Sequence, residues 1–212
     1  QRQMCIRDRY TAILNGKLEE AINLTQKAVS DEIPAQTVID NYMTKAMEEV
    51  GRRFENHEIF VPELLLAGRA MKGALEVLKP CLSSENTSHL GKVVIGTVKG
   101  DLHDIGKNIV ASMLEGCGFE VINVGIDVSS DHFIQAVKDN NADILCMSAL
   151  LTTTMGYMKE VIEALKTAGV RNKVKVMIGG APVSESFAHQ IGADGYSENA
   201  NAAVHLAKSL IA

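Results

Sequence analysis

The pattern of apolar residues changes near residue 90, and this change constrains the fold more than any other feature of the chain. Before it, apolar residues recur at the three- or four-residue spacing of amphipathic helices, and no strand-like run occurs. After it, short β-branched apolar runs alternate with helical patterns. We expect strands at 92–98, 119–124, 143–148, 174–178 and 194–197, and helices at 105–114, 131–138, 155–167, 184–190 and 199–210.

The second half is predicted to be a parallel sheet with helices on its faces. Nearly continuous apolar runs suit strands that are buried on both sides. Strict alternation of strand and helix implies right-handed crossovers between parallel strands, and five strands fit the flavodoxin-like order. The fold class is therefore α/β, with an N-terminal four-helix bundle (1–88) followed by a flavodoxin-like, or Rossmann-like, five-stranded parallel-sheet domain (91–212). The segment 80–90 is polar and rich in turn formers, as is typical of a linker, and the first nine residues fit the bundle pattern poorly.

Composition and charge exclude several classes of protein. The chain is 46% hydrophobic and 22% charged, with a mean hydropathy of +0.05, which is ordinary for a globular protein. Its net charge of −5 offers no electrostatic footprint for nucleic acid or anionic lipid. The longest uncharged apolar run, 144–155, is far shorter than the roughly 20 residues of a membrane-spanning helix, and no secretory leader is evident. We therefore expect a soluble cytoplasmic protein with no nucleic-acid or membrane partner.

Three loops that follow predicted strands carry candidate functional residues. Because ligands of such folds bind beyond the carboxyl ends of the strands, these loops should converge on one crevice. In the first loop Asp101 lies two residues before His103, so its carboxylate can fix the imidazole tautomer and raise the basicity of the outward-facing nitrogen. A neutral imidazole held in this way is a good ligand for a transition metal such as cobalt. Gly106 and the pair Gly179-Gly180 remove side chains, which leaves a slot for a flat or rod-shaped ligand.

Each of these elements also has an ordinary structural explanation. An Asp and a His two residues apart occur by chance, glycines after strands often only make turns, and the threonines at 152–154 can cap a helix. The chain has no GxSxG nucleophile elbow, no phosphate-binding loop motif and no GxGxxG after the first predicted strand. Binding of flavin mononucleotide would need a hydroxyl-rich phosphate loop at the place where Asp101 and His103 stand.

Taken together, the elements resemble the binding signature of corrinoid proteins of the methylcobalamin type. The signature reads Asp101-x-His103-x-x-Gly106, then 41 intervening residues, Ser148-x-Leu150, 28 intervening residues and Gly179-Gly180. The segment 58–66 (EIFVPELLL) of the helical half is similar to the cap bundle of the same family. In length and layout the chain is similar to corrinoid proteins of methylamine, methanol and betaine methyltransferase systems, and it resembles the cobalamin-binding module of methionine synthase.

The resemblance implies cobalamin as the cofactor, in its methylcobalamin and cob(I)alamin states, bound base-off with its cobalt ligated from below by His103. Asp101 would hydrogen-bond to that imidazole, and the hydroxyl of Thr154 would complete the relay. Phe60 with Leu64 or Leu65 would shelter the upper, methyl-bearing face. The other cofactor-binding residues that the resemblance implies lie at the strand ends: Leu102, Asp104, Ile105, Gly106, Ser148, Leu150, Thr152, Gly179 and Gly180.

The resemblance implies the function of a methyl carrier in one-carbon metabolism. Such a subunit is not catalytic alone: one methyltransferase methylates the cofactor from a methylated amine or similar donor, and a second passes the methyl group to tetrahydrofolate or a thiol coenzyme. A reductive activator of the corrinoid is a third expected partner, and 80–90 is the expected hinge of a mobile cap. The alternative is a cobalamin-binding sensor, which would usually add an output domain, for example a DNA-binding one; no basic helix for one is seen in the sequence.

Overall fold

The computed structural model describes residues 10–81 and 90–212. The first nine residues and most of the predicted linker at 80–90 therefore lie outside the described residues. Contacts within the chain divide it into two compact units. The described residues of the first unit are 10–81 with Glu115–Gly118, and those of the second are 90–114 with Phe119–Ala212. The predicted domain limits at 1–88 and 91–212 stay a prediction.

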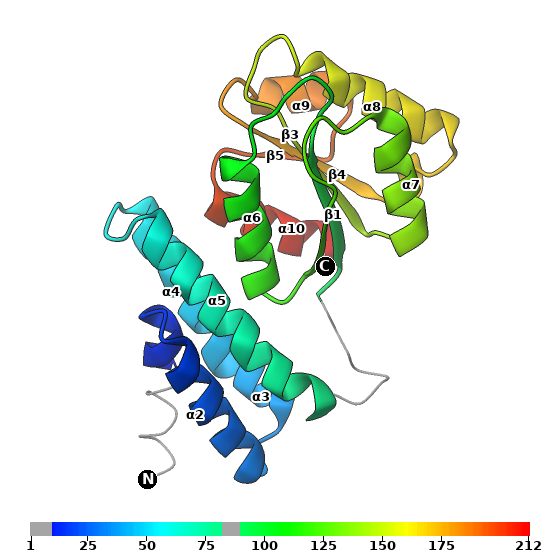
Figure 1. The fold of residues 1–212 in the computed structure, drawn as a ribbon. Coiled ribbons are helices and arrows are strands. Elements are labelled where there is room, and N and C mark those ends of the chain that lie inside the picture. Colours follow the sequence, from blue (N-terminus) through cyan, green and yellow to red (C-terminus); the bar gives the residue numbers. More distant parts are fainter. Residues whose placement is uncertain (1–9, 82–89) are drawn as a thin grey trace. The chain divides into compact units, whose positions relative to one another are not determined.

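The first unit is a bundle of helices (Figure 1). A helical stretch at 10–14 ends at the turn Asn15-Gly16, and the elements that follow are α2 (Leu18–Ser30), α3 (Ala35–Val38), a π-helical segment (Ile39–Met43), α4 (Thr44–Glu55), α5 (Val61–Leu78) and a 3-10 turn (Lys79–Cys81). Helix α2 packs against α5, and the alanines buried in both helices allow close approach. The helical spacing of apolar residues from Pro34 to Phe54 predicts one continuous helix, and the structure contains it with a π-helical interruption at Ile39–Met43.

The second unit is a five-stranded parallel sheet in the order β2-β1-β3-β4-β5, which confirms the predicted fold class and strand order. The strands are β1 (Lys92–Thr97), β2 (Glu120–Asn123), β3 (Ile144–Ser148), β4 (Lys175–Gly179) and β5 (Gly195–Ser197). The helices are α6 (Ile105–Gly116), α7 (Ser130–Asn140), α8 (Gly156–Thr167), α9 (Glu185–Ile191) and α10 (Ala200–Ile211), with a 3-10 turn at Arg171–Lys173. Successive strands are added outward in both directions from β1, so a topological switch point lies between β1 and β3.

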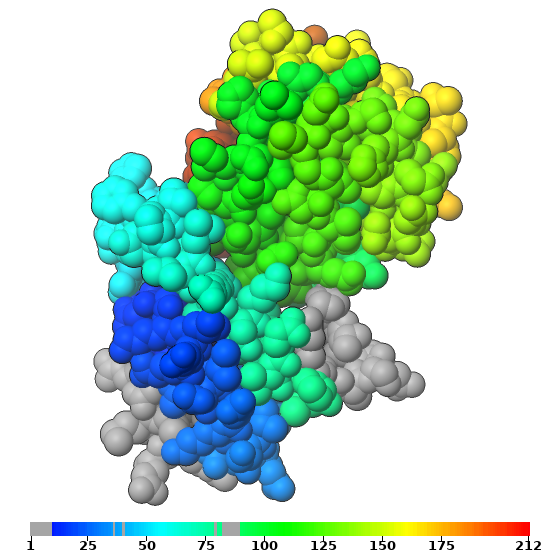
Figure 2. Space-filling view, in the orientation of Figure 1, coloured from blue at the N-terminus to red at the C-terminus, as the bar shows by residue number. Residues whose placement is uncertain are grey.

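Helices cover both faces of this sheet. One face packs on α7, α8 and α9 through an apolar core that includes Phe133, Leu145 and Ile162, all fully buried. The other face lies toward α6 and α10 (Figure 1). In the space-filling view the visible surface of this unit is mostly green and yellow, the colours of the residues from β1 to α8 (Figure 2). Among the described residues, no helix is both long and apolar enough to span a bilayer.

Candidate functional site

The carboxyl edge of the sheet carries a row of small residues. Thr97 pairs in register with Ser148, Ser148 with Gly179, and Gly179 with Ser197. These pairs join the ends of β1, β3, β4 and β5, and the row includes the switch point between β1 and β3. The three loops that the sequence marks all leave the sheet at this edge, as predicted.

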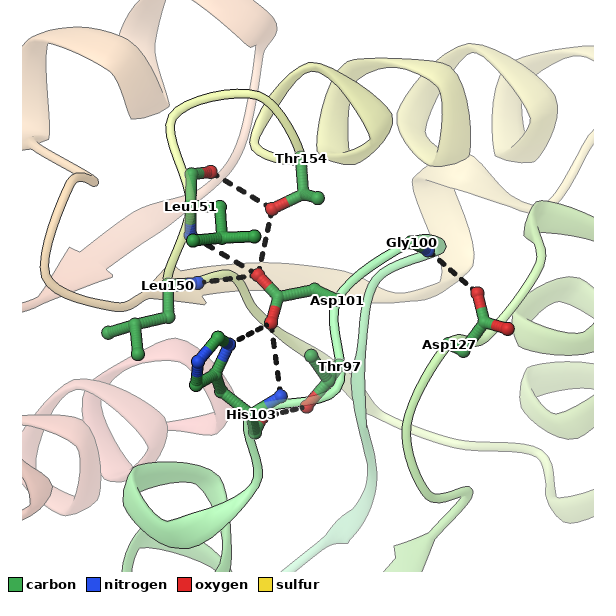
Figure 3. Close-up of polar contacts among 8 residues, drawn as sticks. All are labelled: Thr97, Gly100, Asp101, His103, Asp127, Leu150, Leu151 and Thr154. Atoms are coloured by element: carbon green, nitrogen blue, oxygen red, sulfur yellow. Dashed lines mark hydrogen bonds and ion pairs between the residues drawn. The ribbon is translucent and has the colours of Figure 1, made fainter.

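Asp101 is the centre of a hydrogen-bond network in the loop after β1 (Figure 3). Its side chain is fully buried, and both carboxylate oxygens accept hydrogen bonds. Oδ1 accepts from the backbone N–H of His103 (3.1 Å) and lies 2.8 Å from His103 Nδ1. Oδ2 accepts from the N–H groups of Leu150 (2.8 Å) and Leu151 (3.3 Å) and from the hydroxyl of Thr154 (2.8 Å). One carboxylate thus ties the loop after β1 to the loop after β3.

This network keeps Asp101 ionised. Burial alone would raise its pKa, but hydrogen bonds from the Leu150 N–H, the His103 ring, the Thr154 hydroxyl and the His103 N–H together hold the pKa of Asp101 well below its usual value. The Thr154 hydroxyl also lies 2.9 Å from the carbonyl of Leu151, but its single proton goes to the charged, stronger acceptor. Because an ionised carboxylate only accepts, the proton at the contact with His103 resides on Nδ1.

We expect Asp101→Asn to lower the free energy of unfolding at pH 7 by about 3 kcal/mol, because buried donors lose their charged acceptor. The folded-state pKa of Asp101 is below the unfolded value of about 3.9. The carboxylate therefore contributes stability that is complete above that value and is lost as the pH falls toward the folded-state pKa. Urea unfolding of the wild type and the variant should show a difference that shrinks on acidification.

The matched control for this measurement is Asp139→Asn, at an exposed carboxylate on α7. It should leave both the stability and its acid dependence close to those of the wild type, as is usual for surface changes. A stability difference between Asp101→Asn and the wild type that stays constant from neutral pH to about pH 3 would contradict the assignment.

His103 presents one ring nitrogen away from this network. Its side chain is 51% exposed, although Asp101 beside it has no exposed surface. With the proton on Nδ1, a neutral ring has its lone pair on Nε2, and in the described part of the chain Nε2 has no hydrogen-bond partner. The backbone carbonyl of His103 accepts from the Thr97 hydroxyl at 2.9 Å. The arrangement is that of a preoriented nitrogen ligand with its outer partner already in place.

Exposed aliphatic side chains flank this imidazole. Leu102 is 67% exposed and Ile105 74%, on either side of it in the chain, while Leu150 is 43% and Leu151 42% exposed on the facing loop. A cluster of large exposed apolar side chains marks a binding surface. A Cβ on Gly106 would meet nothing within 4 Å, so the first turn of α6 adjoins open space. The His103 nitrogen and the exposed apolar side chains around it fit a broad, partly apolar ligand with a central metal.

Close contacts with neighbouring backbone explain why glycine occupies positions 179 and 180, and these contacts were not predicted from the sequence. Gly180 has φ +126°, and a Cβ there would overlap the carbonyl oxygen of Ala149. A Cβ on Gly179 would lie 3.1 Å from the carbonyl oxygen of Ser197. The fold therefore requires glycine at 180 for the close approach of the segments after β3 and β4, with or without a ligand.

The remaining predicted residues are divided between the two units. Asp104 accepts a hydrogen bond from Asn108 at 3.0 Å, and Thr152 is exposed in the loop after β3. In the helical unit Phe60 is 65% and Leu65 42% exposed, whereas Leu64 is only 2% exposed. Contacts of these residues with a ligand stay predictions.

Sequence reasoning missed several polar residues that support the site. Lys107 on α6 is 4% exposed, and its Nζ donates to the side-chain oxygens of Asn108 (2.8 Å) and Asn123 (2.7 Å). Burial lowers the pKa of Lys107, and nearby Asp104 partly offsets that effect. Thr97 and Asp127 also hold the loop after β1. The signal that could have found them is their place in the chain: Thr97 is the last residue of β1 and Asp127 lies in the loop that follows β2, and functional loops follow the carboxyl ends of strands.

Comparisons with known proteins agree at the levels of sequence and structure. Two family models, both described as B12 binding domain, match residues 91–205 and 6–79. The dimethylamine corrinoid protein of Methanosarcina barkeri is 45% identical over 202 residues, which cover 95% of this chain and 94% of that protein. The crystal structure of a cobalamin-binding protein from Desulfitobacterium hafniense is similar with a TM-score of 0.80 and 36% identity, over 97% of this chain and 98% of that one. The methanol:cobalamin methyltransferase complex of Methanosarcina barkeri contains a chain with a TM-score of 0.85 and 31% identity, over 100% of this chain and 81% of that one.

The fold and the site define a protein in which a helical unit precedes a B12-binding α/β domain with one carboxylate-oriented imidazole at the switch point. The chain belongs to the B12-binding corrinoid proteins of methyltransferase systems. Its cofactor is cobalamin, and the metal is the cobalt of that cofactor.

Proposed function

We propose that this chain is a methyl carrier that holds cobalamin base-off, with Nε2 of His103 as the lower cobalt ligand, and serves two partner methyltransferases in turn. The observation that carries the proposal is the 2.8 Å contact between His103 Nδ1 and the buried, ionised Asp101, on a half-exposed ring. Cobalamin, when bound, supplies a cobalt centre that accepts and releases a methyl group.

The chain's own residues orient the ligand nitrogen and hold one proton. Asp101 Oδ1 keeps the proton on His103 Nδ1, so Nε2 is available to the metal. Thr154 and the N–H of Leu150 donate to Oδ2 and stabilise the negative charge of the carboxylate. The hydrogen-bonded series Thr154, Asp101 and His103 therefore couples ligation at Nε2 to the proton at Nδ1. Loss of this proton from Nδ1, or its return, changes the strength with which Nε2 donates to the metal.

The exposed apolar residues supply the remaining contacts in this proposal. Leu102, Ile105 and Leu150 bind the corrin on the α/β side, and the row of small residues at the sheet edge admits the displaced nucleotide tail. Phe60 and Leu65, both exposed on the helical unit, exclude water from the upper face. Leu64 is buried and contributes to the core of the helical unit instead.

The proposed partners follow from the relatives. One related chain is part of a methanol:cobalamin methyltransferase complex, and several relatives are dimethylamine corrinoid proteins. We therefore assign to this chain a donor methyltransferase specific for a methylated amine or similar compound, an acceptor methyltransferase and a reductive activator of the corrinoid, all in the cytoplasm. Substrate specificity then resides in the partner enzymes.

Reconstitution tests the proposal directly. The purified full chain is incubated with hydroxocobalamin, freed of excess ligand, and examined by visible spectroscopy. We expect about one cobalamin per chain and the spectrum of a cobalamin with a histidine nitrogen below cobalt. After reduction, a donor methyltransferase with its methylamine substrate should methylate the bound cofactor. Absence of cobalamin uptake would contradict the proposed cofactor site. Uptake without methylation by any donor enzyme of the methylamine or methanol classes would contradict the carrier function and favour a cobalamin-binding sensor.

A further inference from the structure

The loop between β1 and α6 carries both Asp101 and His103, and much of it faces solvent. Leu102 and His103 are exposed, and Gly100 adopts φ +78°. Among the described residues, the only backbone–backbone hydrogen bond within this loop runs from the N–H of Asp101 to the carbonyl of Val98, at 3.2 Å. A ligand nitrogen on such a loop needs support from outside it to keep one direction.

Thr97 supplies one support, at the last residue of β1. Its side chain has no exposed surface, and its hydroxyl donates to the backbone carbonyl of His103 at 2.9 Å. Its own backbone is held on both sides: its N–H donates to Gly125, and its carbonyl accepts from Val128, both at 3.0 Å. Thr97 is therefore a rigid anchor for the main chain of His103.

Asp127 supplies the second support, from the same segment that pairs with Thr97. Its Oδ1 accepts from the N–H of Gly100 at 2.7 Å (Figure 3). Its own N–H donates to the carbonyl of Asp101 at 3.0 Å. Asp127 has φ 53°, in the left-handed region that a short polar side chain tolerates better than most. The segment 125–128 thus holds the chain on both sides of the Asp101 side chain.

We propose that Thr97 and Asp127 are positioning residues that brace this loop and so set the direction of His103 Nε2 toward cobalt. The proposal rests on the proposed function, because it concerns the residue assigned there as the ligand. Asp101 fixes the ring through Nδ1, whereas Thr97 fixes the carbonyl of His103 and Asp127 fixes the backbone of Gly100 and Asp101. The hydrogen bonds of both bracing side chains go to the backbone of the loop, at His103 and Gly100, so both side chains act on the imidazole through the loop.

Two matched pairs of variants test the brace in the full chain loaded with hydroxocobalamin. Thr97→Val keeps the shape and removes the hydroxyl, while Thr97→Ser keeps the hydroxyl. Asp127→Gly keeps the left-handed backbone and removes the acceptor, while Asp127→Asn keeps an acceptor. The readout is the electron paramagnetic resonance spectrum of the cobalt(II) form, in which an axial nitrogen splits each cobalt line into three.

We expect Thr97→Val to lower the ratio of nitrogen-ligated to unligated cobalt about tenfold, as is usual for the loss of an outer partner, and Thr97→Ser to restore it. Asp127→Gly should lower the ratio about threefold, since its hydrogen bond is exposed, and Asp127→Asn should restore it. Without cofactor, the Gly100 amide should exchange with deuterium faster in Asp127→Gly than in Asp127→Asn.

The outcomes distinguish the positioning role of Thr97 and Asp127 from the assignment of His103 as the cobalt ligand. If the ratio of nitrogen-ligated to unligated cobalt is the same in Thr97→Val as in the wild type, the bracing role is wrong, and His103 remains the ligand. If Thr97→Val does not fold, the Asp127 pair decides, and equal ratios in Asp127→Gly and Asp127→Asn overturn the brace. Absence of nitrogen splitting in the wild type overturns the ligand assignment itself, and the brace with it.

Discussion

Alanine in place of His103 is expected to lower the affinity for cobalamin by about 100-fold or more. Loss of an outer partner of a metal ligand already costs about 10- to 100-fold, and loss of the ligand itself costs at least as much. The side chain is half exposed, so its removal leaves no cavity in the core, but the buried Asp101 carboxylate loses one donor. The free energy of unfolding of the apoprotein should therefore fall by about 1 kcal/mol. Titration with hydroxocobalamin, followed in the visible spectrum, measures both the affinity and the change in cobalt coordination.

Two further samples make this result specific. His132→Ala removes another exposed imidazole, on α7, and should bind cobalamin like the wild type. Free imidazole added to His103→Ala should restore part of the nitrogen-ligated spectrum, because the small base can enter the space that the side chain vacates. Wild-type affinity and spectrum in His103→Ala would remove the ligand assignment.

The second large effect is expected for Gly180→Ala, this time on folding. A Cβ at this position would overlap the carbonyl oxygen of Ala149, which is main chain, at a backbone φ of +126° that residues with a Cβ rarely adopt. We expect the free energy of unfolding to fall by about 3–5 kcal/mol, or the protein to fail to fold. Because Ala149 precedes Leu150, whose N–H donates to Asp101, the damage should extend to the site.

Gly106→Ala is the matched control for this prediction. The added methyl would meet nothing within 4 Å, and the residue lies in the first turn of α6, so the stability should stay the same or rise by about 0.5–1 kcal/mol. In the proposed site the same methyl enters the space of the cofactor, so cobalamin affinity should fall. Urea unfolding and cobalamin titration of both variants separate the two glycines. Equal unfolding curves for Gly180→Ala and the wild type would contradict the packing argument.

The α/β architecture was predictable because its physical cause is local. Each buried parallel strand requires a nearly continuous apolar run, and the four such runs contain β1 to β4 in the expected order, while the shorter fifth strand predicted at 194–197 is β5. The helix predicted at 34–54 contains a π-helical segment at Ile39–Met43, which periodicity does not resolve, because one extra residue in a turn hardly changes the average spacing.

The candidate site was predictable only in part. Asp101 and His103 are two residues apart, so their contact could be inferred from the sequence. The contact of Thr154 with Asp101 joins residues 53 apart in the chain, and it was inferred from the resemblance to a family. The contact between Gly100 and Asp127 joins residues 27 apart and belongs to no motif, so it was not predicted. Lys107 was missed because a lysine in a helix is expected to face solvent, whereas Asn108 and Asn123 hold it in a buried position.

The sequence alone determined the two kinds of secondary structure, the α/β fold and the pairing of a carboxylate with an imidazole, because these depend on periodicity and short spacing. Only the tertiary structure decided that Asp101 is completely enclosed by donors from two loops, that glycine at 180 is required by a neighbouring carbonyl, and that Thr97 and Asp127 support the loop. These features depend on distances between segments that the fold brings together. A hydrogen bond or a steric overlap changes within a few tenths of an ångström, and no pattern along the chain specifies a position that finely.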